Sequence, residues 1–493
     1  MSDFITRYPY QFDEREKPFF DEWQTRLDAV NNRGPIDVQA LINGTLDKNT
    51  PGIGTVLAVT EDMIAYYAQK YLPENPLYND ADYAKKAGYL DIPAIMTYAA
   101  HDDTYLTPCP REARDVMLVS GLNHSVKAYK PVYAGDMLYL VVDNQHFTDL
   151  TPAEGSDYRN LAISTSGSIY NQKGELVSEV VFRARENLKT YKPGKKPVAD
   201  VDGIGSDIGW EGPDWGRRKD HKYTDEDWAR IKEIWANEKI RGDEPLYWED
   251  VNIGDEPCVT ADGPVDDSIE PIFNWGPGLG GTRTLKKEIM DPEVFKTMKR
   301  NPWDGIYRLD KRSDSYPAFP AWAHDVYGAC ENDPAKIKKY IAEHPGMYDK
   351  FLMNTSFKDN DDPMSEPPER YFLINFCGRD FALRHFTNWA GDTGWIKEIK
   401  WGIMPDLCMK EYGYDLPVNP EAVDFMAVYP ERQGMCKHHP IERDMYITHS
   451  KVFDKRVENG EYLVDLVWWQ EAITGDVFQE GHCTVSLPSR EKE

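Results

Sequence analysis

The sequence predicts an α+β fold built from two copies of one unit, each a sheet of antiparallel strands around a helix. Three observations lead to this prediction. The first half places helices before strands, a strand-turn-strand pattern recurs near the C-terminus, and residues 376–401 combine a helix with a strand. At 493 residues the chain is too long for one ordinary hydrophobic core, so two units are the natural expectation.

The stretch at residues 376–401, FCGRDFALRHFTNWAGDTGWIKEIKW, is the centre of the second half. Its apolar residues recur at helical spacing, and the Gly-Asp-Thr-Gly that follows ends a helix, because glycine tolerates a left-handed conformation. Residues 395–401 then alternate between two faces, as a strand does. A very apolar helix followed at once by a strand is what a sheet that curls around one central helix requires.

The first half begins with helical signals. A strand at 56–59 is followed by Thr60, a favourable N-cap for a helix whose first turn carries acidic residues. Two prolines then force a loop, and a second helical segment is expected from Asp80 to Ala87, ending at Gly88.

Strand patterns follow, and they recur. Residues 122–150 alternate on both sides of a Gly-Asp turn, which predicts a hairpin, and 161–170 with 176–185 predict another. Near the C-terminus, 462–470 and 480–487 repeat the second pattern around another Gly-Asp turn. The duplicated unit of about 200 residues is too long for a solenoid. We therefore expect two copies of one fold, packed sheet edge to sheet edge into one continuous sheet.

Residues 191–243 are rich in Lys, Pro, Gly and Asp and are expected to link the two copies. One helix at 224–239, with a single apolar face formed by Trp228, Ile231 and Trp235, is expected inside this linker and to pack across both halves. The predicted domains are thus an N-terminal unit (1–190), the linker (191–243) and a C-terminal unit (244–493). The last contains a large insertion at about 286–370.

Composition excludes several classes of function. The 57 basic and 84 acidic side chains give a formal net charge of −27, which opposes nucleic-acid binding. The seven cysteines are odd in number and scattered, so neither a disulfide framework nor a metal site is expected, and the chain fits a reducing compartment. Because no run of about 18 apolar residues occurs, no membrane association is expected and the predicted location is cytoplasmic.

Six segments, in order along the chain, resemble the MaoC-like acyl dehydratases, which are akin to the dehydratase part of fatty-acid synthases. They are ENPLYNDADYA (74–84), YKPVYAGDMLYLVV (129–142), YWEDVNIGDE (247–256), NWGPGLGG (274–281), TNWAGDTGW (387–395) and GHCTVSLPSR (481–490). The resemblance implies a double hot-dog fold, in which each half is a curled antiparallel sheet wrapped around a central helix. It also implies reversible hydration of a 2-enoyl thioester, usually on coenzyme A.

That chemistry needs a base to activate water, an acid to protonate Cα and N–H donors for the thioester oxygen. The family supplies Asp and His from a D-x-N-P-x-H loop, and donors from the N-terminus of the central helix. In the first half, Pro73 stands at the Asp position and Tyr78 at the His position, so this half is expected to be silent. Glu74 is a displaced carboxylate that could act instead; in the alternative interpretation, Asn75 and Asp80 only hold the loop and cap the next helix.

In the second half, His324 beside Asp325, with Ala329 after them, resembles the H-x-D-x-x-x-A remnant of long family members. We predict that His324 and Asp325 are catalytic, the alternative being that His324 is a structural hydrogen-bonding residue. Asp392 is a further catalytic candidate, against the interpretation that it ends the helix.

The expected substrate-binding residues include glycines that let the backbone approach a thioester and a cation for a phosphate or carboxylate. They are Trp275, Gly278, Gly280, Arg283, Asn75, Tyr78 and Arg379. The site is expected in the second half, at a mouth formed by residues 274–283, the insertion around His324 and the start of the central helix.

The leading hypothesis is a hydro-lyase acting on an acyl-CoA, with one active half and no cofactor beyond the coenzyme A of the substrate. The altered loop and the insertion favour an unusual acyl group that is cyclic, aromatic or carboxylated, and a homodimer or larger homo-oligomer is expected. The 14 Trp, 29 Tyr and 18 Phe fit an aromatic-lined pocket. Two alternatives stay open: a hot-dog acyl-CoA thioesterase, and a non-catalytic acyl-CoA-binding protein.

Overall fold

The computed structural model describes residues 17–99, 117–149, 158–189, 221–265, 285–309, 377–402 and 443–492, together with residues 364, 366 and 441. Its helices are α1 (Lys17–Asn32), α2 (Val38–Ile42), α3 (Glu61–Tyr71), α4 (Ala81–Lys86), α6 (Asp225–Asn237), α7 (Lys286–Met290), α8 (Pro292–Phe295) and α11 (Cys377–Ala390). Short 3₁₀ turns lie at η1 (Pro76–Tyr78), η2 (Met96–Ala99), η6 (Trp248–Asp250) and η9 (Arg490–Lys492).

The strands of the first half are β1 (Ile53–Ala58), β2 (Met117–Ala128), β3 (Met137–Asp149), β4 (Tyr158–Tyr170) and β5 (Leu176–Lys189). Those of the second half are β6 (Thr260–Asp262), β7 (Met298–Arg300), β8 (Tyr307–Leu309), β9 (Trp395–Gly402), β10 (Tyr446–Glu458), β11 (Glu461–Glu471) and β12 (Val477–Ser486).

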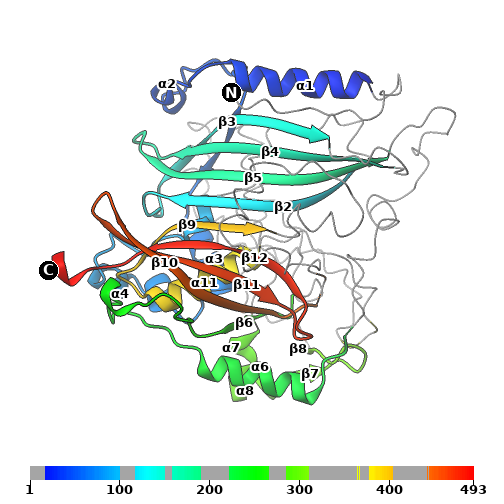
Figure 1. Cartoon of the computed structure of the whole chain (residues 1–493), viewed down its shortest axis with the longest axis vertical. Helices are drawn as coiled ribbons and strands as arrows, with labels where there is room; N and C mark the ends of the chain where they lie inside the picture. The colour runs from blue at the N-terminus through cyan, green and yellow to red at the C-terminus, as the bar shows by residue number, and fades with distance from the viewer. Residues whose placement is uncertain are drawn as a thin grey trace.

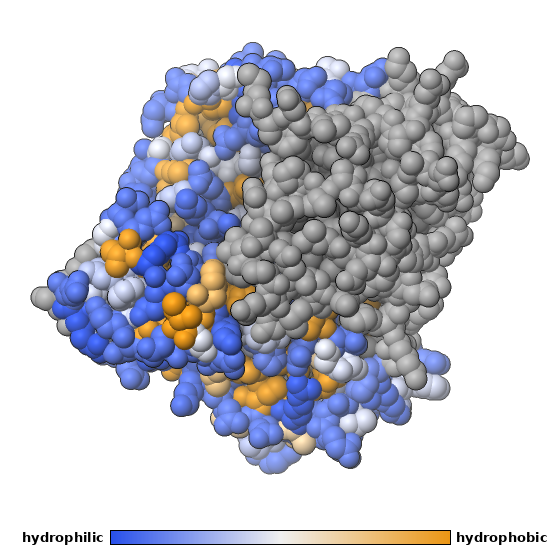
Figure 2. Space-filling model, in the orientation of Figure 1, coloured by the Kyte–Doolittle hydropathy of each residue, from blue (hydrophilic) through white to orange (hydrophobic). Residues whose placement is uncertain are grey.

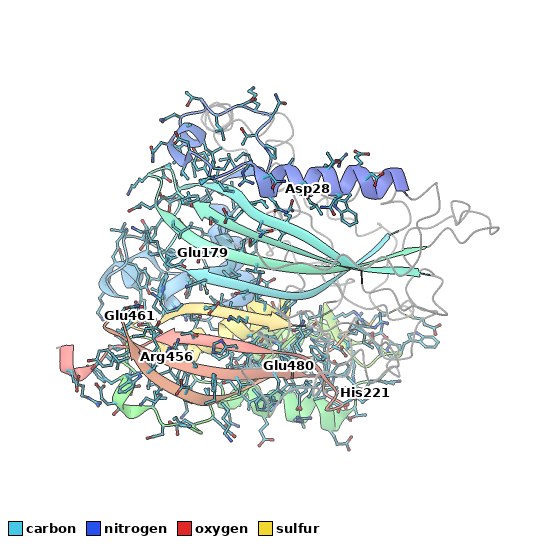
Figure 3. The ribbon with its side chains drawn as sticks, turned by 45° about the horizontal axis from the view of Figure 1, so that its top comes forward. Asp28, Glu179, His221, Arg456, Glu461 and Glu480 are labelled. Atoms are coloured by element: carbon cyan, nitrogen blue, oxygen red, sulfur yellow. The ribbon has the colours of Figure 1, made fainter. Side chains whose placement is uncertain are left out.

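One sheet of ten strands runs through the described structure, in the order β1-β3-β4-β5-β2-β9-β12-β11-β10-β6 (Figure 1). Every neighbouring pair is antiparallel. The first five strands come from the first half and the last five from the second, and they join where Val126 of β2 lies opposite Ile399 of β9. Figure 3 shows Glu179 on one side of this seam and Glu480 and Arg456 on the other. The prediction of two antiparallel halves paired edge to edge is confirmed.

The larger of two hydrophobic cores in the described structure extends under both halves of the sheet. It combines buried side chains of β1 and β3 in the first half with those of α11, β9, β11 and β12 in the second. Helix α11 lies at the predicted place and contacts α3, and the rings of Tyr71 and Phe381 meet edge to face with centroids 5.5 Å apart. Phe381 and Phe386 are fully buried, so this helix is held by tertiary packing rather than by propensity.

The local helix signals were predictive. The hydroxyl of Thr60 accepts a hydrogen bond from the Met63 amide at the start of α3, and Asp80 caps α4 in the same way. Gly88, which follows α4, has a φ of +96°, a conformation that glycine adopts without strain. The hairpins β4–β5 and β11–β12 also form as predicted, each around a glycine with positive φ at Gly174 or Gly475.

The predicted hairpin within 122–150 is wrong. Both strands exist, but β2 pairs with β5 and β9, whereas β3 pairs with β1 and β4. The Gly-Asp turn before β3 does not lead back to β2. Instead, the amide of Gly135 donates to the carbonyl of Val59 at 2.9 Å, just beyond the end of β1. The chain therefore crosses from β2, at one edge of the first-half sheet, to β3, which lies next to the opposite edge strand β1.

Helix α6 begins with a capping box between Thr224 and Asp227, as its sequence favours. Its apolar face is buried as predicted, but the prediction that it packs across both halves is wrong. Trp228 and Trp235 donate to the carbonyls of Gly305 and Ala261, both at 2.8 Å, and the described part of this smaller core contains only residues from 223 onward. The apolar face of α6 is therefore buried against the second half alone, beside the edge strand β6.

Most of the insertion at 286–370 lies outside the described residues; its described part holds α7, α8 and the hairpin β7–β8. On the face shown in Figure 2 the coloured atoms are largely hydrophilic, and the apolar residues form separate patches. In the described part of the chain, no helix has the length and hydropathy needed to cross a membrane.

Candidate functional site

The inner face of the second-half sheet turns polar beside the start of α11. Thr448 on β10, Gln470 on β11 and Gln479 on β12 lie opposite one another in register, and all three are fully buried. Their same-face neighbours along the strands, such as Trp468 and Gly481, are apolar. We call these three residues the polar row. Buried polar side chains need hydrogen-bond partners, so their contacts decide what the row can do.

Two members of the polar row hold the helix in place. The amide nitrogen of Gln470 donates to the carbonyl of Gly378 at 2.8 Å and contacts the hydroxyl of Thr448 at 3.0 Å. Gln479 differs, because neither its amide oxygen nor its amide nitrogen has a partner in the structure described. A Cβ added to Gly378 would lie 1.8 Å from the amide oxygen of Gln479, so this amide rests directly on the first turn of α11.

The start of α11 carries a buried ion pair. The helix dipole also places partial positive charge at the N-terminal end of a helix. The guanidinium of Arg379 is paired with the carboxylate of its neighbour Asp380 (Nε–Oδ1 3.0 Å), and both are buried. Arg379 therefore lies at the predicted place, with its charge compensated. Beside this end of α11, the side-chain amide of Gln479 has no hydrogen-bond partner in the structure described.

A cavity of about 40 Å³ lies on the seam, near the other end of α11. That volume can hold a few water molecules. The first half contributes the loop that carries Tyr78 and the β5 residue Ser178, and the second half contributes α11 and β9. The main lining residues are Leu77, Tyr78, Tyr89, Ile95, Met96, Ser178, Leu383, Thr387, Trp395 and Ile396.

Tyr78 occupies the cavity wall as a phenol, not as a base. Burial raises its pKa far above the ordinary value of a tyrosine, and its side chain hydrogen-bonds to that of Thr387 on α11. Burial likewise raises the pKa of Tyr89 to about 12. Among the described lining residues there is no His, Asp or Glu. The described lining of the cavity therefore offers no carboxylate or imidazole side chain.

Asp392 lies beside this cavity and joins the two halves. Its carboxylate accepts a hydrogen bond from the Tyr83 hydroxyl at 2.6 Å, and the Tyr89 hydroxyl donates to its backbone carbonyl at 3.3 Å. Burial raises the pKa of this carboxyl. The residue that bends the chain at the end of α11 is Gly391, with a φ of +71°. Asp392 thus follows the helix end and binds the first half.

The loop from Glu74 to Asp80 is shaped by its own side chains. Asn75 accepts from the Leu77 amide at 3.0 Å, and Asp80 accepts from the Asp82 amide at 2.9 Å. Asn75 thus shapes the loop and Asp80 caps the next helix; the substrate-binding role of Asn75 stays a prediction. Glu74 does not line the cavity; its carboxylate pairs with the ammonium of Lys286 at 2.5 Å.

Lys286 belongs to a buried ionic cluster. Its Nζ also lies 2.7 Å from Glu238, which accepts two hydrogen bonds from Arg384 at 2.9 and 3.0 Å. Arg384 in turn pairs with Asp262 through Nε and Oδ1 at 2.9 Å. Burial raises the pKa of Asp262 to about 7, with Arg384 opposing the rise and Glu238 adding to it. Burial alone would raise the pKa of Glu238, but Arg384 and Lys286 hold it below its usual value.

His385 is a structural residue. Its ring nitrogens lie 3.2 Å from the Thr260 hydroxyl and 2.7 Å from the Ser450 hydroxyl. Burial, together with the charge of Arg384, lowers its pKa to about 3, so the ring is neutral near pH 7.

Six predicted site residues lie outside the described residues, and their roles stay predictions: His324, Asp325, Trp275, Gly278, Gly280 and Arg283. The polar row was missed. A usable signal existed, because Gln470 follows Trp468 by two residues and Gln479 precedes Gly481 by two. Each glutamine thus interrupts an otherwise inward-facing apolar series.

No family model matches this chain, and no curated protein matches it by sequence. Solved structures do resemble it. A MaoC-like dehydratase is 13% identical, covering 89% of this chain and 98% of its own, with a TM-score of 0.38. A putative MaoC domain dehydratase from Chloroflexus aurantiacus is 11% identical over 90% and 100% of the two chains, with a TM-score of 0.38. A conserved hypothetical protein from Mycobacterium tuberculosis, described as a double hotdog fold, is 10% identical over 92% and 99%, with a TM-score of 0.35.

Proposed function

We propose that this chain is a double hot-dog hydro-lyase that adds or removes water at a 2-enoyl or 3-hydroxyacyl thioester, with coenzyme A as part of the substrate. The observation that carries the proposal is the fully buried amide of Gln479, without a partner and resting on the first turn of α11. A buried polar group left unpaired in the folded protein costs about 1–3 kcal/mol, which favours a role in binding.

The chemistry asks for donors at that place. When water adds to C3 of the enoyl group and a proton to C2, negative charge develops on the thioester oxygen. The amide nitrogen of Gln479 would donate to that oxygen. One such donor is worth about 10²- to 10³-fold in rate. The same contacts serve dehydration in the reverse direction.

The acid and base are proposed from the sequence. His324 is the proton-exchanging group in this proposal, because imidazole has an unperturbed pKa of about 6.5, and Asp325 is its partner. The first half does not compete for this role, since Tyr78 offers a protonated phenol and the carboxylate of Glu74 is paired with Lys286. The proposed acyl group is cyclic, aromatic or carboxylated, in line with the altered loop and the insertion.

The test is incubation with a panel of enoyl-CoAs of differing acyl groups, followed by mass spectrometry. A gain of one water with the thioester intact supports the proposal. Release of free CoA thiol would instead identify a thioesterase. If no substrate changes while one or more still raise the melting temperature, the chain is a non-catalytic acyl-CoA-binding protein.

A further inference from the structure

The ionic cluster connects two places that the chain keeps far apart. Glu74 is the first residue of the first-half loop (Glu74–Asp80) that carries Tyr78. Its carboxylate pairs with Lys286 of the second half at 2.5 Å. Lys286 also pairs with Glu238, at the C-terminal end of α6, at 2.7 Å. Glu238 accepts two hydrogen bonds from Arg384 on α11. The loop is thus tied to the central helix of the second half through three charged contacts.

The other end of the same loop reaches the same helix. The side chain of Tyr78 hydrogen-bonds to Thr387, which lies one helical turn after Arg384. The contacts close a ring that runs from Arg384 through Glu238, Lys286 and Glu74 along the loop to Tyr78, and back to α11. A segment fixed at both ends to one rigid helix has little freedom left, so each tie restricts the other.

The charged members of this ring differ in their exposure to solvent. Side chains of Lys286 and Glu238 are 9% and 1% exposed, whereas that of Glu74 is 40% exposed. Charges inside the protein must stay paired, while an exposed carboxylate is solvated whether or not it is paired. Of the three charged contacts in the ring, the Glu74–Lys286 contact is therefore the one that can be cut, by changing Glu74, without stranding a buried charge, because Glu238 still pairs with both Lys286 and Arg384.

We propose that Lys286 is a positioning residue that holds the first-half loop, through Glu74, against α11 and so fixes the Tyr78 phenol in the seam cavity. The role assigned to Glu74 is a latch for this loop. The proposal stands apart from the hydro-lyase activity, because it concerns the arrangement of the two halves without any ligand.

The test is amide hydrogen exchange on the ligand-free protein, read by mass spectrometry in peptides that cover residues 74–80. The amides of Tyr78, Asn79 and Asp80 donate to carbonyls within this loop, so their exchange reports its opening. Glu74→Gln and Lys286→Met should each speed exchange in these peptides, by about twofold to fivefold. The double variant should be no faster than Lys286→Met alone, because that change already removes the contact with Glu74. The matched control is Glu461→Gln. This change cuts the ion pair between Glu461 and Lys397, whose exposure is similar to that of the Glu74–Lys286 pair, and it should leave exchange in the loop unchanged.

Unchanged exchange in the loop of folded Glu74→Gln would overturn the proposal, as would additive effects in the double variant. If Lys286→Met speeds exchange equally in the β4–β5 hairpin, that variant reports general destabilisation, and the comparison of Glu74→Gln with Glu461→Gln decides alone. Because no substrate enters the experiment, its failure leaves the hydro-lyase proposal untouched, and a failed activity assay leaves the latch untouched.

Discussion

Replacing Gln479 by leucine should make the protein more stable and less active. The amide of Gln479 is fully buried and has no partner in the described structure. Leucine has a similar volume and removes the two polar atoms whose desolvation is uncompensated, a cost of about 1–3 kcal/mol. Some of that gain is lost to imperfect packing, so we expect the free energy of unfolding to rise by about 1 kcal/mol. If the same amide donates to the thioester oxygen, kcat should fall by about 10²- to 10³-fold.

The neighbouring strand supplies a matched control. Gln470 lies directly opposite Gln479, is equally buried, and donates to Gly378 and Thr448. Gln470→Leu strands those acceptors, so it should lower the free energy of unfolding by about 1–3 kcal/mol. The assay is denaturant unfolding of both variants, together with kcat on an enoyl-CoA that the wild-type protein hydrates.

Two results would refute this reasoning. A Gln479→Leu protein that unfolds as easily as Gln470→Leu would mean that the amide is satisfied in the folded protein. A stabilised variant with unchanged kcat would mean that the start of α11 is not where the thioester oxygen sits.

Three further predictions concern other groups. Because burial raises the pKa of Asp262 to about 7, above the unfolded value of 3.8, the folded state holds the proton more tightly; the resulting stability is complete below about pH 4 and is lost as pH rises through 7. Between about pH 5 and 8, the free energy of unfolding of Asp262→Asn, measured in urea, should therefore fall less than that of the wild type. If both proteins lose the same free energy over this range, Asp262 does not cause the loss. Tyr83→Phe removes the donor to the buried carboxylate of Asp392 and should lower the free energy of unfolding by about 1–3 kcal/mol; an unchanged thermal melt would show that the contact is unimportant. His324→Ala should lower kcat by about 10²- to 10⁴-fold with an unchanged melting temperature, while Glu74→Gln keeps near-normal kcat; an early melt with normal kcat would make His324 structural.

Much of the fold could be predicted because its signals are local. Thr60, Asp80 and the apolar spacing of α11 each specify an element from a few adjacent residues, and the structure has all three. Strand partners are not local. The alternation in β2 and β3 shows that each is a strand, but it contains no information on which strand lies beside it. The apolar face of α6 has the same limit, since a stripe indicates burial and not the surface that buries it.

The candidate site was harder to predict for a related reason. A notable residue type such as His385 is hydrogen-bonded inside the core, whereas the residue used in the proposal, Gln479, is a glutamine whose amide has no partner in the described structure. Gln479 becomes notable only once its strand, its inward face and the nearby start of α11 are known together. The charged latch at Glu74 and Lys286 is equally invisible in sequence, because its partners are more than 200 residues apart.

The most direct test of the central claim is to follow where water goes. The chain is incubated with enoyl-CoAs in water labelled with heavy oxygen, and mass spectrometry locates the label after the thioester and any free acid are separated. Hydration predicts the label in the acyl chain of an intact CoA thioester, formed more slowly by Gln479→Leu. Label found only in a free carboxylate, with release of CoA thiol, would contradict the account and identify thioester hydrolysis instead.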